Sequence, residues 1–256
     1  MNSSAGLLRA EALLFGYPGC EPFTSAFDFE LAEGEVVALM GENGCGKSTL
    51  LKTFAGLLLP RGGTVLLCGR TVAAVRSADR MADRERARLV ALVRMGVAPP
   101  ARMTVREFVS LGRTPYSGIL DGRSPHDEKC IDDAMALLDV SRFADRAVAE
   151  LSDGERSRVF LAQAVAREVK VLLLDEPNAF LDIPRSHALF RTLRSLAQER
   201  KMGIVVSTHS LEYAERYSDR IAVIDAGAFK VESASNARSA GLFGWTEKPY
   251  DKEDRI

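Results

Sequence analysis

A glycine-rich segment early in the chain has the residue types and the spacing needed to bind phosphate. It reads Gly-x-x-x-x-Gly-Lys-Ser from Gly41 to Ser48. Glycines let backbone N–H groups wrap around a phosphate, and a helix that starts there adds the positive end of its dipole. Lys47 would reach the β- and γ-phosphates, and the Ser48 hydroxyl would bind Mg²⁺. The segment predicts a nucleoside triphosphate site.

Two consecutive carboxylates can supply the rest of the chemistry. The apolar run Val171–Leu174 is typical of a buried strand, and Asp175 and Glu176 follow it directly. A strand of a parallel sheet delivers such residues to the edge where the phosphate loop lies. We therefore expect Asp175 to hold Mg²⁺ through water. On an extended backbone Glu176 would point the other way, free to orient and deprotonate the attacking water.

The elements that must position these residues follow from hydrophobic patterning. Strands are predicted at Val36–Met40, Val65–Cys68, Leu89–Val93, Val171–Leu174 and Ile204–Thr208, with a hairpin of Ile221–Asp225 and Ala228–Glu232 around Gly227. Helices are predicted over residues 47–58, 76–88, 157–169, 184–200 and 210–217. Strands that alternate with helices imply a mostly parallel sheet that is covered on both faces.

The middle and the end of the chain differ from this pattern. Residues 98–151 contain few β-rich runs, and apolar residues recur at helical spacing in Thr104–Gly112 and His126–Val140. This stretch is interpreted as a helical insertion. The segment after Ala234 is polar and is expected to be loosely held.

Composition narrows the class of protein. The 256 residues are 46% hydrophobic and 27% charged, with a net charge of −1, which argues against a broadly basic surface for nucleic acid. The four cysteines have no CxxC spacing and predict neither a disulfide framework nor a zinc site, as suits a reducing cytosol. No apolar run is long enough for a membrane span, so membrane contact would come through a partner.

The segment Leu151–Arg156, LSDGER, can be interpreted in two ways. It fits a capping box, in which Ser152 caps a helix and Glu155 reaches back to the cap. It also fits a phosphate-binding helix end, because a capping box does not require Gly154, and a glycine in a first turn costs about 1 kcal/mol relative to alanine. Both interpretations can hold at once.

Five motifs in order resemble the signature of ABC-type ATPases, from about Tyr17 to Gly227. They are Gly41–Thr49, Leu151–Glu155, Leu172–Pro177, Ala179–Asp182 and Thr208–His209. The resemblance implies an α/β fold: a P-loop NTPase (RecA-like) core with a mostly parallel sheet, an antiparallel β subdomain near the N-terminus and a helical signature subdomain. It places the ATP-binding core in residues 1–95 and 168–234, the helical subdomain in 96–167 and a short tail in 235–256.

The resemblance also implies a role for each matching residue. Tyr17 would stack on adenine, and His209 would contact the γ-phosphate beside the catalytic Glu176 and Lys47. Ser152 and Gly154 would bind the ATP held by a second subunit in a head-to-tail dimer, and Asp182 would communicate between the subunits. The full set expected to bind ATP is Tyr17, Gly41, Glu42, Asn43, Gly44, Cys45, Gly46, Lys47, Ser48, Thr49, Ser152, Gly154 and Asp182; Ser48 and Asp175 would hold Mg²⁺.

Within the family, Met103–Gly118 (MTVREFVSLGRTPYSG) is similar to the ATPases of iron-chelate, haem and cobalamin importers. The resemblance implies a homodimer on two transmembrane permease subunits, at the cytoplasmic face of the cell (inner) membrane, with an extracytoplasmic binding protein delivering the cargo. Ferric siderophore uptake is the favoured function. Haem or cobalamin import, an exporter ATPase and a soluble ATPase acting on nucleic acid or ribosomes are the alternatives; direct nucleic-acid binding is not expected.

One position departs from the family pattern. The strand Leu89–Val93 usually leads to a Gln that touches Mg²⁺, but here that position holds Met95, which cannot ligate Mg²⁺. Either a neighbouring backbone group or water replaces the glutamine, or the contact is dispensable. His126 and His187 match no motif and are interpreted as surface groups.

Overall fold

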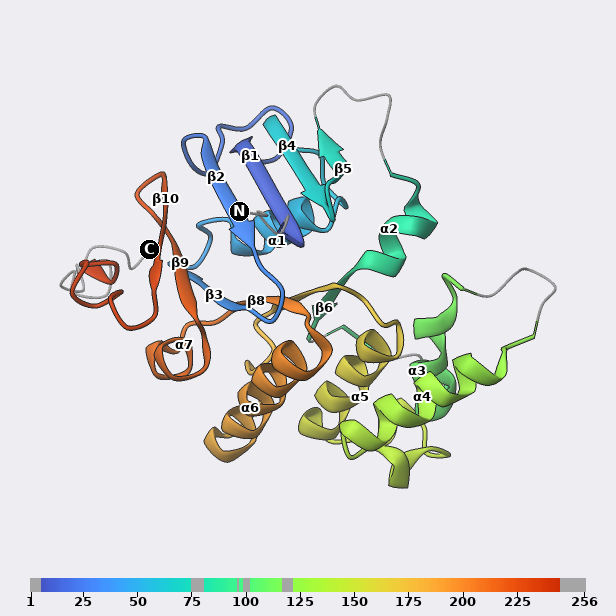
Figure 1. The fold of residues 1–256 in the computed structure, drawn as a ribbon. Helices are drawn as coiled ribbons and strands as arrows, with labels where there is room; N and C mark the ends of the chain where they lie inside the picture. The colour runs from blue at the N-terminus through green and yellow to red at the C-terminus, as the bar shows by residue number, and fades with distance from the viewer. Residues whose placement is uncertain (1–5, 75–80, 96, 99–101, 117–121, 245–256) are drawn as a thin grey trace.

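The fold consists of two sheets and a group of helices, which Figure 1 shows in one view. The structure, a computed structural model, describes residues 6–74, 81–95, 97–98, 102–116 and 122–244. Among these residues no helix is both long and apolar enough to cross a membrane.

The larger sheet has six strands in the order β10-β9-β3-β8-β7-β6. Their bounds are β3 Val36–Gly41, β6 Val90–Arg94, β7 Val171–Asp175, β8 Gly203–Ser207, β9 Arg220–Asp225 and β10 Ala228–Ser233. Five strands run parallel, and β10 returns antiparallel to β9 through the predicted hairpin. Every residue of β3 is buried, as expected for a strand that is covered on both faces. The mixed, mostly parallel sheet is confirmed.

A separate antiparallel sheet lies over one face, in the order β2-β1-β4-β5. Its strands are β1 Leu8–Leu14, β2 Phe27–Leu31, β4 Gly62–Leu67 and β5 Arg70–Ala74. The helix α1, Lys47–Phe54, packs Leu50, Leu51 and Phe54 into the core between the sheets. The antiparallel β region near the N-terminus is thus present, although the sequence patterns located only β4 among its strands.

The helices on the other face enclose a second core. They are α3 Val105–Ser110, α4 Pro125–Leu137, α5 Asp153–Ala166, α6 Ile183–Arg200 and α7 Leu211–Tyr217, with short 3₁₀ turns at Leu111–Arg113, Ser141–Phe143 and Val148–Glu150; α2, Asp83–Leu89, precedes β6. Alternate residues of each parallel strand face the two cores, so Leu172 and Leu174 meet these helices, and Val171 and Leu173 face α1.

Several expectations about element ends are corrected. The helix predicted over residues 47–58 ends at Phe54, because Gly56 adopts φ 67 and turns the chain away. The helix predicted from Ser157 begins at Asp153, one residue after its cap. The first residues of the stretch 76–88 lie outside the described chain, and α2 begins at Asp83.

Two further expectations were wrong. The segment after Ala234 is not loosely held through residue 244: Ala237, Leu242 and Phe243 are buried in a third core against β3, β9 and α7. Residues 245–256 lie outside the described part. His187 is not a surface group either, because Tyr217 and Tyr213 pack against its ring.

Candidate functional site

The phosphate loop joins β3 to α1, as its motif predicts. Lys47, the first residue of α1, is 5% exposed. Its Nζ donates hydrogen bonds to the carbonyl oxygens of Gly41 and Glu42, each at 2.9 Å. The ammonium is therefore held against the backbone of the loop.

Glycine is required at three points of the loop for different reasons. Gly41, Gly44 and Gly46 have φ values of 143, 81 and 102, in the region that favours glycine. A Cβ on Gly46 would lie 2.6 Å from the Phe23 ring, and one on Gly41 would lie 2.5 Å from the Ile224 carbonyl oxygen. A Cβ on Gly44 would meet nothing within 4 Å. The loop therefore packs against Phe23 and Ile224 at Gly46 and Gly41, and it faces open space at Gly44.

The remaining residues of the loop differ in exposure. Glu42 and Asn43 are exposed, Ser48 is half-buried in the first turn of α1, and Thr49 is buried. Burial raises the pKa of the Cys45 thiol, so that side chain stays neutral and packs against the core. No acidic residue occupies the first turn of α1, so its N-terminus is suited to an anion.

The two carboxylates lie at the carboxyl edge of the sheet, where β7 ends. The Ser207 hydroxyl, at the end of the neighbouring β8, donates to Asp175 Oδ1 at 3.1 Å and accepts from the Glu176 backbone N–H at 2.8 Å. Ser207 is fully buried, so this bridge fixes the turn at the end of β7. A carboxylate and the Ser48 hydroxyl are hard oxygen donors of the kind Mg²⁺ prefers, so the donor set fits that ion.

The backbone at Glu176 corrects one step of the sequence argument. The residue is not extended, because its φ is 48, in the left-handed region. A non-glycine residue held there stores backbone strain, which is common at functional sites. The direction of the Glu176 side chain therefore comes from this turn and from its partners, and not from strand alternation.

His209 is the partner that holds the Glu176 carboxylate. His209 Nε2 lies 2.7 Å from Glu176 Oε1, and both side chains are about two-fifths exposed at 42% and 40%. His209 follows β8, and Glu176 follows β7, so the adjacent parallel strands bring them together. The pair combines a carboxylate able to orient water with an imidazole that fixes it.

Tyr17, the residue predicted to stack on adenine, lies beside the first turn of α1. Its ring is edge-on to Phe23, with centroids 6.4 Å apart, and the residue is 45% exposed. Thr49 Oγ1 lies 3.4 Å from the Tyr17 hydroxyl. An exposed aromatic face next to a phosphate loop can stack on a base.

The signature segment is a helix cap, as one of the two interpretations requires. Ser152 is the N-cap of α5; its Oγ accepts from the Glu155 N–H at 3.4 Å, and Glu155 Oε2 accepts from the Ser152 N–H at 2.9 Å. The backbone and hydroxyl of Ser152 lower the pKa of the Glu155 carboxyl. The capping box is confirmed, and it leaves the phosphate interpretation open.

Gly154 lies next to a cation that the sequence argument missed. A Cβ at Gly154 would lie 3.1 Å from Cδ and 3.3 Å from Nη1 of Arg185. Arg185 is exposed, and its Nε also lies 3.6 Å from Asp182 Oδ2. Asp182 itself is the N-cap of α6 and accepts from the Arg185 N–H at 2.9 Å. The start of α6 therefore lies against the start of α5 in this chain.

The structure shows what occupies the region of the missing glutamine. Met95 packs against the helix-side core and offers no ligand to a metal. Its neighbour Arg94 points back to the site instead, with Nε 3.7 Å from Asp175 Oδ2. A side-chain cation therefore lies beside the proposed magnesium ligand, and replacement of the glutamine by a backbone group or water, or a dispensable contact, both stay predictions.

Arg94, Ser207 and Arg185 are the site residues that sequence reasoning missed. Ser207 ends a strand adjacent to Val171–Leu174, so the strand-edge rule that selected Asp175 applies to it equally. Arg94 ends the next strand on the other side. Arg185 gave no signal, because it lies near Gly154 only through the packing of two helix ends.

Comparison with known proteins agrees with this arrangement. The profile of the ABC transporter family matches residues 24–179. The chain is 32% identical to the ferric enterobactin transport ATP-binding protein of Escherichia coli over 91% of this chain and 84% of that protein. It is 35% identical to a siderophore transport system ATP-binding protein of Bacillus subtilis (85% and 76%) and 41% identical to a hemin import ATP-binding protein of Nocardia farcinica (82% and 70%).

A solved structure supports the same conclusion. A metal-chelate type ABC transporter in an inward-facing conformation matches with a TM-score of 0.78 at 27% identity, over 93% of this chain and 89% of that one. With more than half of the chain matched by the family profile and several relatives above 30% identity, the chain belongs to the ABC transporter family and is an ATP-binding ATPase subunit.

Proposed function

We propose that this chain powers the import of a ferric siderophore or a related iron chelate. The observation that carries the proposal is the joint placement of Lys47, Asp175, Glu176 and His209 at one edge of the parallel sheet, in a chain whose relatives are named for siderophore and hemin transport.

In the proposed reaction the chain's own groups bind ATP and activate water. Lys47 exchanges its two carbonyl partners for the β- and γ-phosphates, the loop N–H groups surround the phosphates, and Tyr17 stacks on the adenine. Mg²⁺, held by Ser48 and Asp175, would neutralise charge that develops on the phosphates. Glu176, oriented by His209, accepts a proton from the attacking water.

The signature helix completes the site of a second subunit. The N-terminus of α5 would offer backbone N–H groups and the exposed Ser152 to an incoming phosphate, once the Arg185 side chain that lies against the buried Gly154 moves aside. We propose a head-to-tail homodimer in which these groups contact the γ-phosphate bound by the partner's phosphate loop. Asp182, the N-cap of α6, pairs with Arg185, the side chain beside Gly154, and would transmit closure between the two sites.

The dimer is proposed to act on a membrane assembly. Two permease subunits would bind the dimer at the cytoplasmic face of the inner membrane, and an extracytoplasmic binding protein would deliver the chelate. With Met95 at the position of the usual glutamine and Arg94 beside Asp175, coupling between Mg²⁺ and the helical subdomain would differ from that of the family pattern.

Uptake in whole cells tests the substrate and the enzyme together. A host that lacks this subunit is complemented with the wild-type chain or with Glu176→Gln, and uptake of ⁵⁵Fe-labelled ferric siderophores, haemin and cobalamin is measured. We expect siderophore uptake with the wild type and background uptake with Glu176→Gln. Uptake of haemin or cobalamin alone would reassign the substrate, and undiminished uptake with Glu176→Gln would contradict the catalytic assignment.

A further inference from the structure

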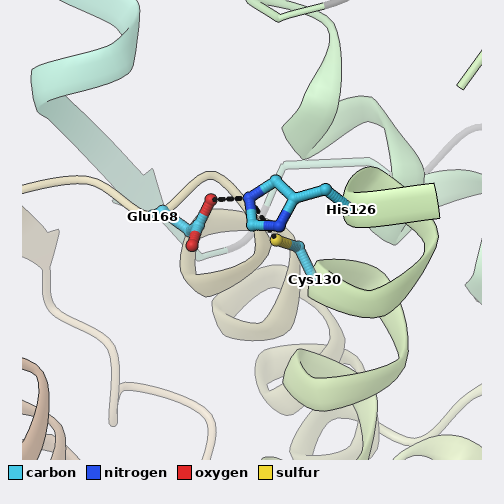
Figure 2. Close-up of side chains that lie close together, drawn as sticks. All are labelled: His126, Cys130 and Glu168. Carbon is cyan, nitrogen blue, oxygen red and sulfur yellow. Dashed lines mark hydrogen bonds and ion pairs between the residues drawn. The ribbon is translucent and has the colours of Figure 1, made fainter. Parts of the chain in front are cut away.

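A second group of chemically reactive side chains lies away from the phosphate loop. His126 and Cys130 are one helical turn apart on α4, and Glu168 lies in the turn that follows α5. Figure 2 shows the three side chains pointing toward one another. One potential ligand atom from each lies within 4.8 Å of the other two. Nothing in the proposed ATPase reaction uses them.

The spacing of these atoms resembles the edges of a tetrahedral zinc site. His126 Nε2 lies 3.1 Å from Glu168 Oε2 and 3.5 Å from Cys130 Sγ. Zinc bonds of about 2.0–2.2 Å to nitrogen and oxygen and about 2.3 Å to sulfur give tetrahedral edges of roughly 3.4 Å for N–O and roughly 3.6 Å for N–S. Little movement is therefore needed to bring three ligands onto one ion.

The donor types also select the metal. A thiolate, an imidazole and a carboxylate together suit Zn²⁺ better than Mg²⁺ or Ca²⁺, which prefer oxygen alone. Cys130 is 8% exposed, whereas the His126 and Glu168 side chains are 65% and 43% exposed. The sulfur therefore forms the floor of the site, and the outer side is open to water as a fourth ligand.

The charges around the cluster can accommodate the ion. Arg113 Nη1 donates to the same Glu168 oxygen at 2.9 Å, but Arg113 also bonds Asp127 at 2.8 Å and the Ala166 carbonyl at 2.8 Å. A carboxylate oxygen has two lone pairs, so the guanidinium can remain as an outer partner that orients Glu168. Zn²⁺ and Arg113 then balance the charges of the thiolate, Glu168 and Asp127.

Binding a metal would cost the proton of the Cys130 thiol. Burial, followed by the Glu168 carboxylate, raises the pKa of the Cys130 thiol to about 11. The thiol is therefore protonated without a metal, and an incoming ion must displace that proton. The same holds for many metal sites whose thiol ligands ionise only on binding.

We propose that His126, Cys130 and Glu168 form a zinc-binding site. The ion would join α4 to the turn between α5 and β7, and so fasten the end of the signature helix to the rest of the helical region. The site is independent of ATP, and it is a site that cysteine spacing could not reveal, because its ligands are one Cys, one His and one Glu. The i, i+4 pair of His126 and Cys130 is the only local signal.

Metal titration of the full chain tests the proposal. Tag-free protein without nucleotide is titrated with Co²⁺, which reports thiolate ligation through an intense near-ultraviolet band, and then with Zn²⁺ as competitor. We expect one equivalent of Co²⁺ with the thiolate band, displaced by Zn²⁺. Cys130→Ser should abolish the band, and His126→Ala should weaken affinity at least about tenfold.

Two controls separate the site from other binding. Lys129→Ala removes a neighbouring side chain of the same hollow that is not a proposed ligand, and Cys20→Ser removes an exposed thiol elsewhere. Both should bind Co²⁺ as the wild type does. Circular dichroism of each metal-free variant checks the fold. Because His126 is exposed and Cys130 is buried, His126→Ala is less disruptive to folding than Cys130→Ser. Absence of the band, its persistence in Cys130→Ser or equal loss in the controls would overturn the proposal.

Discussion

The catalytic edge of the sheet and the signature helix are both proposed to contact ATP, yet they are built differently. At the catalytic edge, residues from separate strands hold one another: Ser207 links Asp175 to the turn at Glu176, and His209 holds the Glu176 carboxylate. At the signature helix, the hydrogen bonds of Ser152 join it to Glu155, three residues away. One region is assembled by the tertiary fold, and the other is a local cap.

The difference indicates which region can act alone. The catalytic edge has its proposed base Glu176, the His209 imidazole bound to it and the proposed phosphate-binding Lys47 within one chain. The signature helix offers donors at a helix end, with the Arg185 side chain as its neighbour. A single chain should therefore bind nucleotide well, whereas hydrolysis should need a second chain.

The largest effect should come from removing the proposed base, Glu176, at the catalytic edge. Glu176→Gln keeps the shape and the proximity to His209 but cannot accept a proton, so we expect kcat to fall by about 10³-fold with little change in ATP affinity. Steady-state phosphate release and equilibrium nucleotide binding measure the two quantities. Glu199→Gln on α6 is the matched control. A fall of less than tenfold would assign the base elsewhere.

A negative charge at the α5 cap tests whether Ser152 acts only as a helix cap or also contacts phosphate. Ser152→Asp remains a good N-cap, so α5 should fold, but its carboxylate would repel a γ-phosphate from the partner subunit. We expect ATPase activity to drop about 100-fold while the chain's own ATP affinity is unchanged.

Thr104→Asp provides the control for that change, because Thr104 caps α3 with an equivalent capping box to Glu107. It should keep near-normal activity. Equal losses in both variants would show that the signature residue acts only through helix stability, and loss of nucleotide binding in Ser152→Asp would refute the contact in trans.

A smaller effect is expected at the adenine platform. Tyr17→Ala removes a stacking face, and stacking on one base is worth about 1–3 kcal/mol, so ATP affinity should weaken about tenfold. Tyr17→Phe keeps the face and should bind ATP as the wild type does. Binding of pyrophosphate, which has no base, should be equal in all three proteins; a change there would mean that the loop itself had been disturbed.

The smallest effect should appear at Arg94. Its guanidinium lies beside Asp175, so Arg94→Gln removes a competing cation and should lower the Mg²⁺ concentration for half-maximal activity by about threefold. Arg9→Gln makes the same change in charge on β1 of the antiparallel sheet, and it should leave the Mg²⁺ requirement unaltered. An increased requirement would mean that Arg94 supports the metal site instead of competing with it.

The same contrast between local and tertiary contacts explains which elements could be predicted from the sequence. The phosphate loop, the strand before Asp175 and the cap at Ser152 depend on neighbours in the chain, and the structure has them where the patterns placed them. The strands of the antiparallel sheet were largely missed. One of them, β1, carries a pairing irregularity that interrupts strict alternation between Ala10 and Leu13.

Contacts between distant segments were beyond the sequence. The left-handed turn at Glu176 is held by Ser207, thirty-one positions later, and Arg185 meets Gly154 through two helix ends. The packing of Phe243 and Leu242 was missed because a few apolar residues in a polar segment give no periodic signal. In each case the deciding neighbour is close in space and remote in the chain.

The two carbonyl bonds made by Lys47 have a consequence for product release. When nucleotide leaves, the ammonium does not become a buried charge without partners, because Gly41 and Glu42 accept from it at once. ADP departure would therefore exchange one set of hydrogen-bond partners of Lys47 for another. Because these carbonyl oxygens compete with phosphate for Lys47, the loop should bind nucleotide less tightly and exchange ADP for ATP faster. Fast exchange suits an ATPase that must release its product in every cycle.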